Sequence, residues 1–253
     1  MPPIALLAST WFALASPVVH SDDLANVCHA SSSYDLTVAS NALIFDRANP
    51  APRRIELHGG SASLDGVALP SNAEAADRLV LFEQDLRALL PKAKAIAANG
   101  VDLLVRAMHA EATSLGLGAQ TQAQLDARLA ARASEIKRRF ASSTSTHDWQ
   151  GDAFDRYAAE ISADIVPLVA ADLGAQALDA AVSGDLDGAA SLRDRAAALD
   201  SDELSARLQG HLQALRPQIQ ALCPSIQRLY ELQRGVRDAK GRPLDLFEID
   251  AAR

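Results

Sequence analysis

The sequence contains few aromatic and few basic residues, and each shortage argues against a class of protein. Aromatic residues make up 4% of the 253 residues although 49% are hydrophobic, so Leu, Ile, Val and Ala must form the core. This composition favours packed helices over a β-sandwich, which normally contains more aromatic and β-branched residues. The 24 Lys and Arg residues are outnumbered by 32 Asp and Glu, which gives a net charge of −8. That balance argues against binding to nucleic acid.

The motifs that usually identify an enzyme or a cofactor site are also missing. The sequence has no H-E-x-x-H metal motif, no G-x-S-x-G nucleophile elbow, no P-loop and no G-x-G-x-x-G loop. It holds only two cysteines and no C-x-x-C, which argues against thiol redox catalysis and a thiolate zinc site. We therefore predict a protein that is not an enzyme, with no catalytic residue and no cofactor. An envelope hydrolase is the enzymatic alternative.

A short apolar segment opens the chain. Residues 1–15 contain an uncharged apolar run that is too short for a membrane anchor, which needs ~20 residues. Ala13-Leu14-Ala15 and Val19-His20-Ser21 both offer cleavage sites, although no Lys or Arg precedes the run. We predict a signal peptide over residues 1–21, a periplasmic location, and no transmembrane segment in the chain that remains.

The two cysteines lie near opposite ends of the predicted mature chain. In an oxidising compartment Cys28 and Cys223 would be each other's only partner. A bridge between them would close a very long loop, which is worth roughly 5 kcal/mol at most by loss of entropy in the unfolded chain. It would also hold the N-terminal segment on the last helix. Two separate buried thiols are the alternative.

Residues 27–70 predict a small antiparallel β meander. Three segments alternate between apolar and polar residues, at YDLTVAS, NALIFDR and RIELHGG. Asp65-Gly66 then stands between two short apolar runs, which is a strong signal for a two-residue hairpin. A sheet this small is not stable alone, so it must pack on the segment that follows.

Residues 71–235 predict a helical domain. Ser71-Asn72-Ala73-Glu74 matches a capping box, after which apolar residues recur at helical spacing. Pro91 should kink this first helix and Asn99-Gly100 should interrupt it. The apolar seam consists of Leu79, Phe82, Leu86, Leu89, Ala93 and Ile96.

Two middle helices and one long last helix should follow. The last helix is expected from about Asp202, with its apolar stripe broken by Pro217 and Pro224. Residues 236–253 form a tail in which LDLFEI alternates like a final strand. The fold class is thus mainly α with a small N-terminal β meander (α+β). Its long, kinked amphipathic helices pack as hairpins in an elongated molecule.

One segment between two predicted helices matches a calcium loop in part. Counting from Ser183, Asp185 and Asp187 fall at positions three and five of a twelve-residue loop, Gly188 at the turn and Asp194 at position twelve. Position one is Ser, and Asp at position twelve has a shorter arm than the usual Glu. The alternative is a polar turn between helices, in which Asp and Gly serve as turn and cap residues.

Together these features resemble a known family. An early Cys, a meander with a D-G hairpin, a helix containing LRALLP and a late Cys in the last helix are similar to the YggN-like family. These secreted bacterial proteins are catalogued as domain of unknown function 2884. The resemblance covers about Val27 to Leu232 and implies a periplasmic protein with a disulfide between Cys28 and Cys223. It implies no catalytic residue.

The predicted function is an interaction or scaffold role in the cell envelope. Long amphipathic helices would offer extended surfaces to a protein partner or to another copy of the chain. The alternative is a periplasmic module that binds calcium or a small ligand, with Asp185, Asp187 and Asp194 as the candidate metal ligands.

Overall fold

The computed structural model describes residues 27–149, 152–197, 210–238 and 240–249 of the chain. The predicted signal peptide, residues 1–21, therefore lies outside the described residues. So does the predicted beginning of the last helix near Asp202, together with the stripe residues Leu204 and Leu208.

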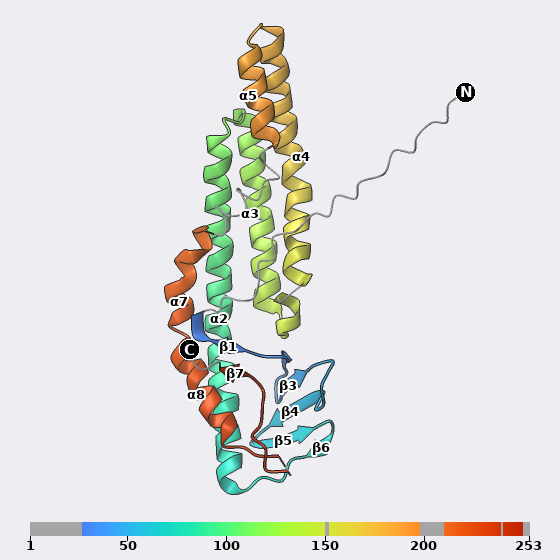
Figure 1. Ribbon diagram of the computed structural model, residues 1–253, viewed down its shortest axis with the longest axis vertical. Coiled ribbons are helices and arrows are strands. Elements are labelled where there is room, and N and C mark those ends of the chain that lie inside the picture. The colour runs from blue at the N-terminus through green and yellow to red at the C-terminus, as the bar shows by residue number, and fades with distance from the viewer. Residues whose placement is uncertain (1–26, 150–151, 198–209, 239, 250–253) are drawn as a thin grey trace, which may run out of the picture.

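The described chain is an elongated α+β molecule, as predicted, with the sheet at one end and a helical hairpin at the other (Figure 1). In chain order the strands are β1 (Ala30–Ser31), β2 (Asp35–Val38), β3 (Leu43–Asp46), β4 (Arg54–His58), β5 (Ser61–Leu64), β6 (Val67–Ala68) and β7 (Glu248–Ile249). The helices are α2 (Ala73–Ser114), α3 (Ala119–Ser142), α4 (Asp152–Val182), α5 (Leu186–Ala197), α7 (Arg216–Gln220) and α8 (Cys223–Arg234), with 3-10 helices η1 (Thr146–Trp149) and η3 (Gln213–Leu215).

The β meander forms as the sequence predicts. Strands β2 to β6 follow one another in an antiparallel sheet, in the order of the chain. The hairpin at Asp65-Gly66 has positive φ at both residues, 49° and 82°, which suits the right-handed twist of the two strands. Alternate residues of β3 and β4 point into the core and pair across the strands, with Leu43 opposite Leu57. The meander therefore presents one apolar face to the helices.

Helix α2 begins one residue later than the capping box predicts. Asn72 is the N-cap, and its side-chain oxygen accepts a hydrogen bond of 2.8 Å from the backbone N–H of Ala75. Glu74 binds Arg78 one turn further on, at 3.1 Å, and does not reach back to the cap. The helix start is within one residue of the prediction, but Asn72 caps it in place of Ser71, by accepting the N–H of Ala75.

The predicted interruption of α2 at Asn99-Gly100 is wrong. The helix continues through both residues and through Pro91 until Ser114. Gly100 is buried, and a Cβ atom placed there would lie 3.1 Å from the Leu215 side chain. The glycine thus allows η3 to approach α2 closely. Packing, which the local sequence does not show, outweighs the weak helix preference of glycine.

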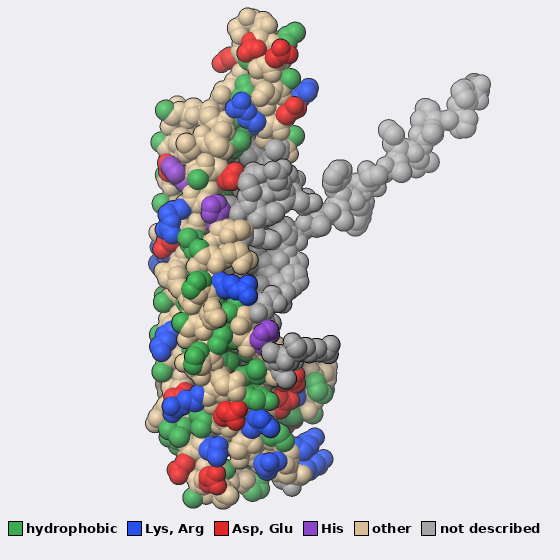
Figure 2. All heavy atoms as spheres, turned by 60° about the vertical axis from the view of Figure 1, so that its left-hand side comes forward, with side chains coloured by type: hydrophobic (Ala, Val, Ile, Leu, Met, Phe, Trp, Pro, Cys, Tyr) green, Lys and Arg blue, Asp and Glu red, His purple; other side chains and the backbone are tan. Residues whose placement is uncertain are grey.

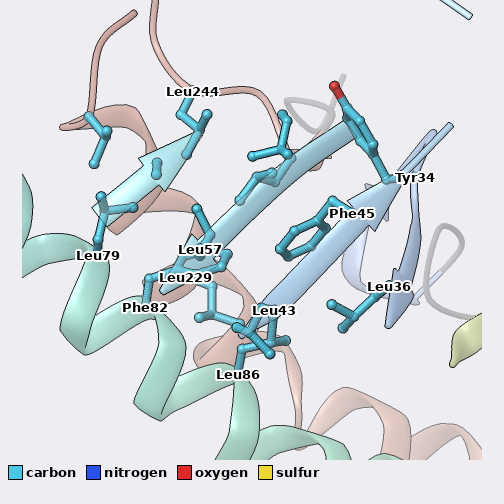
Figure 3. Close-up of a cluster of buried hydrophobic side chains, with 14 of the residues drawn as sticks. Tyr34, Leu36, Leu43, Phe45, Leu57, Leu79, Phe82, Leu86, Leu229 and Leu244 are labelled. Atoms are coloured by element: carbon cyan, nitrogen blue, oxygen red, sulfur yellow. The ribbon is translucent and has the colours of Figure 1, made fainter. Parts of the chain in front are cut away.

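The apolar seam of α2 forms the main core together with the sheet. Leu79 and Phe82 are only 1% exposed and lie against the inward side chains of β3 and β4 (Figure 3). From the other side, Leu229 of α8 and Leu244 of the tail complete this core. The seam that the sequence offers as an interaction surface is therefore occupied within the molecule.

The predicted long last helix is broken in its described part. Pro217 lies in the first turn of α7, and Pro224 lies in the first turn of α8. Proline is tolerated there because the first N–H groups of a helix have no partner within the helix. The two prolines thus start new helices and do not merely bend one.

The tail is held in the main core, and its strand is shorter than predicted. Leu246 is 1% exposed, and its N–H donates to the side-chain oxygen of Gln233 at 3.0 Å. Only Glu248 and Ile249 pair as a strand, antiparallel to β1. The side-chain amide of Gln233, itself buried, replaces a neighbouring strand for the first part of LDLFEI.

The β4–β5 turn is fixed to α2 by a buried carboxylate. Glu83 is 8% exposed, and it accepts hydrogen bonds from the N–H groups of Gly59 and Gly60 at 3.3 and 3.2 Å. Both glycines have positive φ, but only at Gly60 would an added Cβ atom meet the helix. A Cβ atom there would lie 2.9 Å from the backbone oxygen of Ala76.

Replacing each of these glycines with alanine separates backbone strain from contact with α2. We expect G59A to lower the free energy of unfolding by about 1 kcal/mol, the usual cost of positive φ in a residue with a side chain. G60A adds overpacking against Ala76, so its cost should reach about 3 kcal/mol. Urea denaturation measures both values. Equal losses would contradict the close approach of the turn to α2.

Candidate interaction surface

The candidate calcium segment, residues 183–194, consists of a turn at residues 183–185 followed by the first part of α5. Asp185 is the N-cap of α5, since its side-chain oxygen accepts a hydrogen bond of 2.9 Å from the N–H of Gly188. Asp187 and Asp194 follow within α5, seven residues apart, so about 10 Å of helix rise separates them. No group of three metal-binding side chains occurs among the described residues. The alternative interpretation, a polar turn with Asp and Gly as cap residues, therefore fits the segment.

The structure confirms the disulfide between Cys28 and Cys223. The two sulfur atoms lie 2.05 Å apart and the two Cα atoms 5.2 Å apart. Cys223 is the first residue of α8, and Cys28 comes just before β1. A second link lies close by, where the Ser32 hydroxyl donates to the backbone oxygen of Leu246 at 2.7 Å. Both ends of the described chain are thus fixed to the same core.

Helices α4 and α5 form a hairpin at the end of the molecule opposite the sheet (Figure 1). A tight turn at Ser183–Asp185 joins them, and Gly184 in this turn has a φ of 87° that glycine adopts readily. Towards its base the hairpin packs on α2 and α3 in a second core. This core includes Ala112, Leu125, Leu129, Ile165, Val169 and Leu173.

Asp172 of α4 fixes the base of the hairpin to the start of α3. Its carboxylate accepts hydrogen bonds from the Thr121 hydroxyl at 2.6 Å, the N–H of Gly118 at 3.0 Å and the Gln176 amide at 2.6 Å. Gly118, the N-cap of α3, has no side chain, and Asp172 binds the N–H of this residue and the Thr121 hydroxyl from a different helix. The bond from Thr121 and the other hydrogen bonds hold the pKa of this carboxyl below its usual value.

Beyond this base the hairpin exposes large apolar side chains. Leu178 is 65% exposed, Val182 is 81% exposed, and Leu186 across the turn is 71% exposed. Apolar patches of this kind on a folded protein mark sites of interaction with a protein or a membrane. We refer to the surface around these three residues as the hairpin surface.

An open groove of about 490 Å³ lies between the two helices of the hairpin. Leu173 and small residues line it on both sides, among them Gly174 and Ala177 of α4 and Ala189 and Ala190 of α5. The groove is therefore mainly apolar, with Arg193 as its one charged lining residue, and it is open to side chains of another helix. It has no counterpart in the sequence prediction, which placed a calcium loop or a turn in this region.

Helix α4 also contains a segment with the composition of a membrane span. Within the described residues, Ala163–Val182 is long and apolar enough to cross a membrane, with a mean hydropathy of 1.5. Helices of a folded protein that never enter a bilayer can share this length and composition, so the absence of a transmembrane segment after residue 21 stays a prediction. In an 18-residue window of this segment, 17% of the residues are buried, and the others keep part or most of their surface exposed.

The other perturbed carboxyl groups of the described chain have structural partners. The Arg139 and Arg132 side chains lower the pKa of Glu135, with the hydrogen bond from Arg139 as the largest cause. A backbone hydrogen bond from Arg242 likewise lowers the pKa of Asp238. Both groups stabilise local helix or turn geometry. The hairpin surface is therefore the feature of the described chain that most resembles a functional site.

The fold and this surface define a disulfide-linked α+β protein with a protruding helical hairpin. Residues 28–247 match the model of the family described as Protein of unknown function (DUF2884). The chain belongs to this family, as the cysteines and the LRALLP helix suggested. Searches of curated proteins and of solved structures found no match.

The Asp172 network predicts a pH-dependent effect on stability. A carboxyl whose pKa is lowered on folding stabilises the protein above its usual pKa, which is 3.8, and loses this contribution as the pH falls through the lowered value. We expect D172N to lower the free energy of unfolding by about 1 kcal/mol at neutral pH, as for loss of a helix cap. Below pH 3.8 this difference should shrink.

Denaturation at a series of pH values measures the Asp172 effect. The matched control is D179N, an exposed carboxylate on the same helix, for which we expect a change within about 0.5 kcal/mol at every pH. A D172N penalty that stays constant down to acidic pH would show that charge on Asp172 plays no part.

Proposed function

We propose that this protein is a periplasmic, non-enzymatic interaction or scaffold protein of the cell envelope, and that it acts through the hairpin surface. The carrying observation is the exposure of Leu178, Val182 and Leu186 at the end of an elongated molecule. Residues this apolar are normally buried, and their exposure together costs solvation free energy unless a partner covers them.

Two features support a periplasmic location. The apolar run at residues 1–15, followed by two small-residue cleavage sites, is typical of a signal peptide. A structural disulfide such as Cys28–Cys223 forms and persists mainly in oxidising compartments, and the periplasm is one of them. The same bridge leaves no free cysteine in the described chain.

The distribution of apolar residues supports interaction through the hairpin and not through α2. The seam of α2 is covered by the sheet and α8, whereas α4 and α5 have one side packed on the second core and another side open. The core end of the molecule is thus a packed, disulfide-linked base. The hairpin lies at the opposite end, where its exposed apolar residues are accessible to a partner.

Photocrosslinking in intact cells tests this proposal. A crosslinking amino acid is introduced at Leu178 or at Leu186, and for comparison at Gln124, an exposed polar position on α3. We expect protein adducts in the periplasmic fraction from both hairpin positions and few from the control. Adducts of equal yield at all three positions, or none at the hairpin, would contradict an interaction role for this surface.

A further inference from the structure

We propose that a second copy of this chain covers the hairpin surface. The two hairpins would pack antiparallel across their grooves, about a two-fold axis near Ala190, and together form a four-helix bundle. This inference rests on the proposed function, because it names the partner of the same surface. Two-fold dimers are the commonest assemblies of soluble proteins, and each copy then uses the same patch.

The groove and the side chains that could fill it belong to the same hairpin. Small residues at Gly174, Ala177, Ala189 and Ala190 leave the space, and a Cβ atom at Gly174 would meet nothing within 4 Å. Leu186 projects near the turn at one end of this space. An antiparallel copy would bring its own Leu186 towards the base of the groove, where Leu173 lies. The surface is thus complementary to itself.

The charges along α5 select the antiparallel arrangement. Asp187 near the turn and Arg193 nearer the base lie three residues on either side of Ala190, so about 9 Å of helix rise separates them. Turning one copy about Ala190 brings its Asp187 level with Arg193 of the other copy along the helix axis, within reach of the long arginine side chain. The two-fold symmetry repeats this pairing once more. The Arg193 side chain is 79% exposed, and it contacts its chain neighbour Asp194 at 3.8 Å.

A parallel arrangement or a membrane would fit these charges less well. Parallel hairpins would place Asp187 beside Asp187 and Arg193 beside Arg193. A bilayer would have to accept Asp179, Asp185 and Asp187, which surround the turn, and burial of carboxylates in hydrocarbon is costly. Figure 2 shows acidic side chains at the end of the hairpin and basic ones further down on the face that it draws. This distribution favours a protein partner that presents a basic side chain opposite Asp187 and an acidic side chain opposite Arg193, as an antiparallel second copy does.

Sedimentation of the full exported chain over a range of concentrations tests the proposal. We expect wild-type protein to dimerise at micromolar concentration and L186E to remain monomeric, because the glutamate would place a carboxylate in the apolar groove. The control V67E changes an equally exposed apolar residue on β6, far from the hairpin, and should dimerise like wild type. Far-UV circular dichroism confirms that each variant is folded.

Charge reversal tests the orientation. D187R alone and R193D alone should each weaken dimerisation by about tenfold or more, because each places like charges together at both symmetric contacts. Mixing the two variants should restore dimerisation, because every contact in the mixed dimer then joins opposite charges. The double variant D187R/R193D should also dimerise like wild type.

Three results would overturn self-pairing. These are a monomeric wild-type chain, a dimer that L186E does not weaken, and single reversals that are not rescued by mixing. Binding of the monomer to vesicles of phosphatidylcholine and phosphatidylglycerol, lost in L186E, would identify a membrane as the occupant. If self-pairing fails, crosslinked protein adducts at Leu178 or Leu186 in cells would still support the proposed function. If these adducts are also absent, the proposed function is wrong as well.

Discussion

The covalent bond between Cys28 and Cys223 is the constraint on which the rest of the molecule depends. It fixes the segment before β1 to the start of α8, so the first and last described elements share one core with the sheet and α2. Closing so long a loop removes much entropy from the unfolded chain, which helps a core that is poor in aromatic residues. The disulfide and this core stabilise the sheet end of the molecule. The fold therefore does not depend on burial of Leu178, Val182 and Leu186 at the opposite end.

Elements with a strong local signal were predicted correctly from the sequence. The hairpin at Asp65-Gly66 formed because that turn needs positive φ at two residues, and Asp-Gly adopts it readily. The seam is buried from Leu79 to Leu89 and partly buried at Ala93 and Ile96, because its spacing matches one face of a helix. The disulfide followed from the number of cysteines and the apolar N-terminal run. The turn and the seam are local patterns, and for the disulfide there was no other cysteine to pair with, so none of the three required knowledge of the other elements.

Features that depend on contacts between distant segments were missed. Helix α2 continues through Gly100 because η3 packs on that glycine, and the Gln233 side chain pairs with the tail where a strand was expected. The calcium pattern matched by residue type alone, although Asp185 is a helix cap. The hairpin surface was missed because apolar residues lie on all sides of α4, so no stripe separates covered from open faces. One feature of the sequence could have indicated the exposed surface, which is that Leu178, Val182 and Leu186 lie next to a polar turn between two helices.

The most direct test of this account is the redox state of the two cysteines in protein isolated from the cells that naturally make it. The chain is unfolded without reductant, treated with an alkylating reagent and weighed by mass spectrometry. The account predicts no added alkyl group before reduction and one on each of Cys28 and Cys223 after it. Labelling of both residues before reduction would contradict the covalent link, and with it the oxidising location and the shared core of the two chain ends.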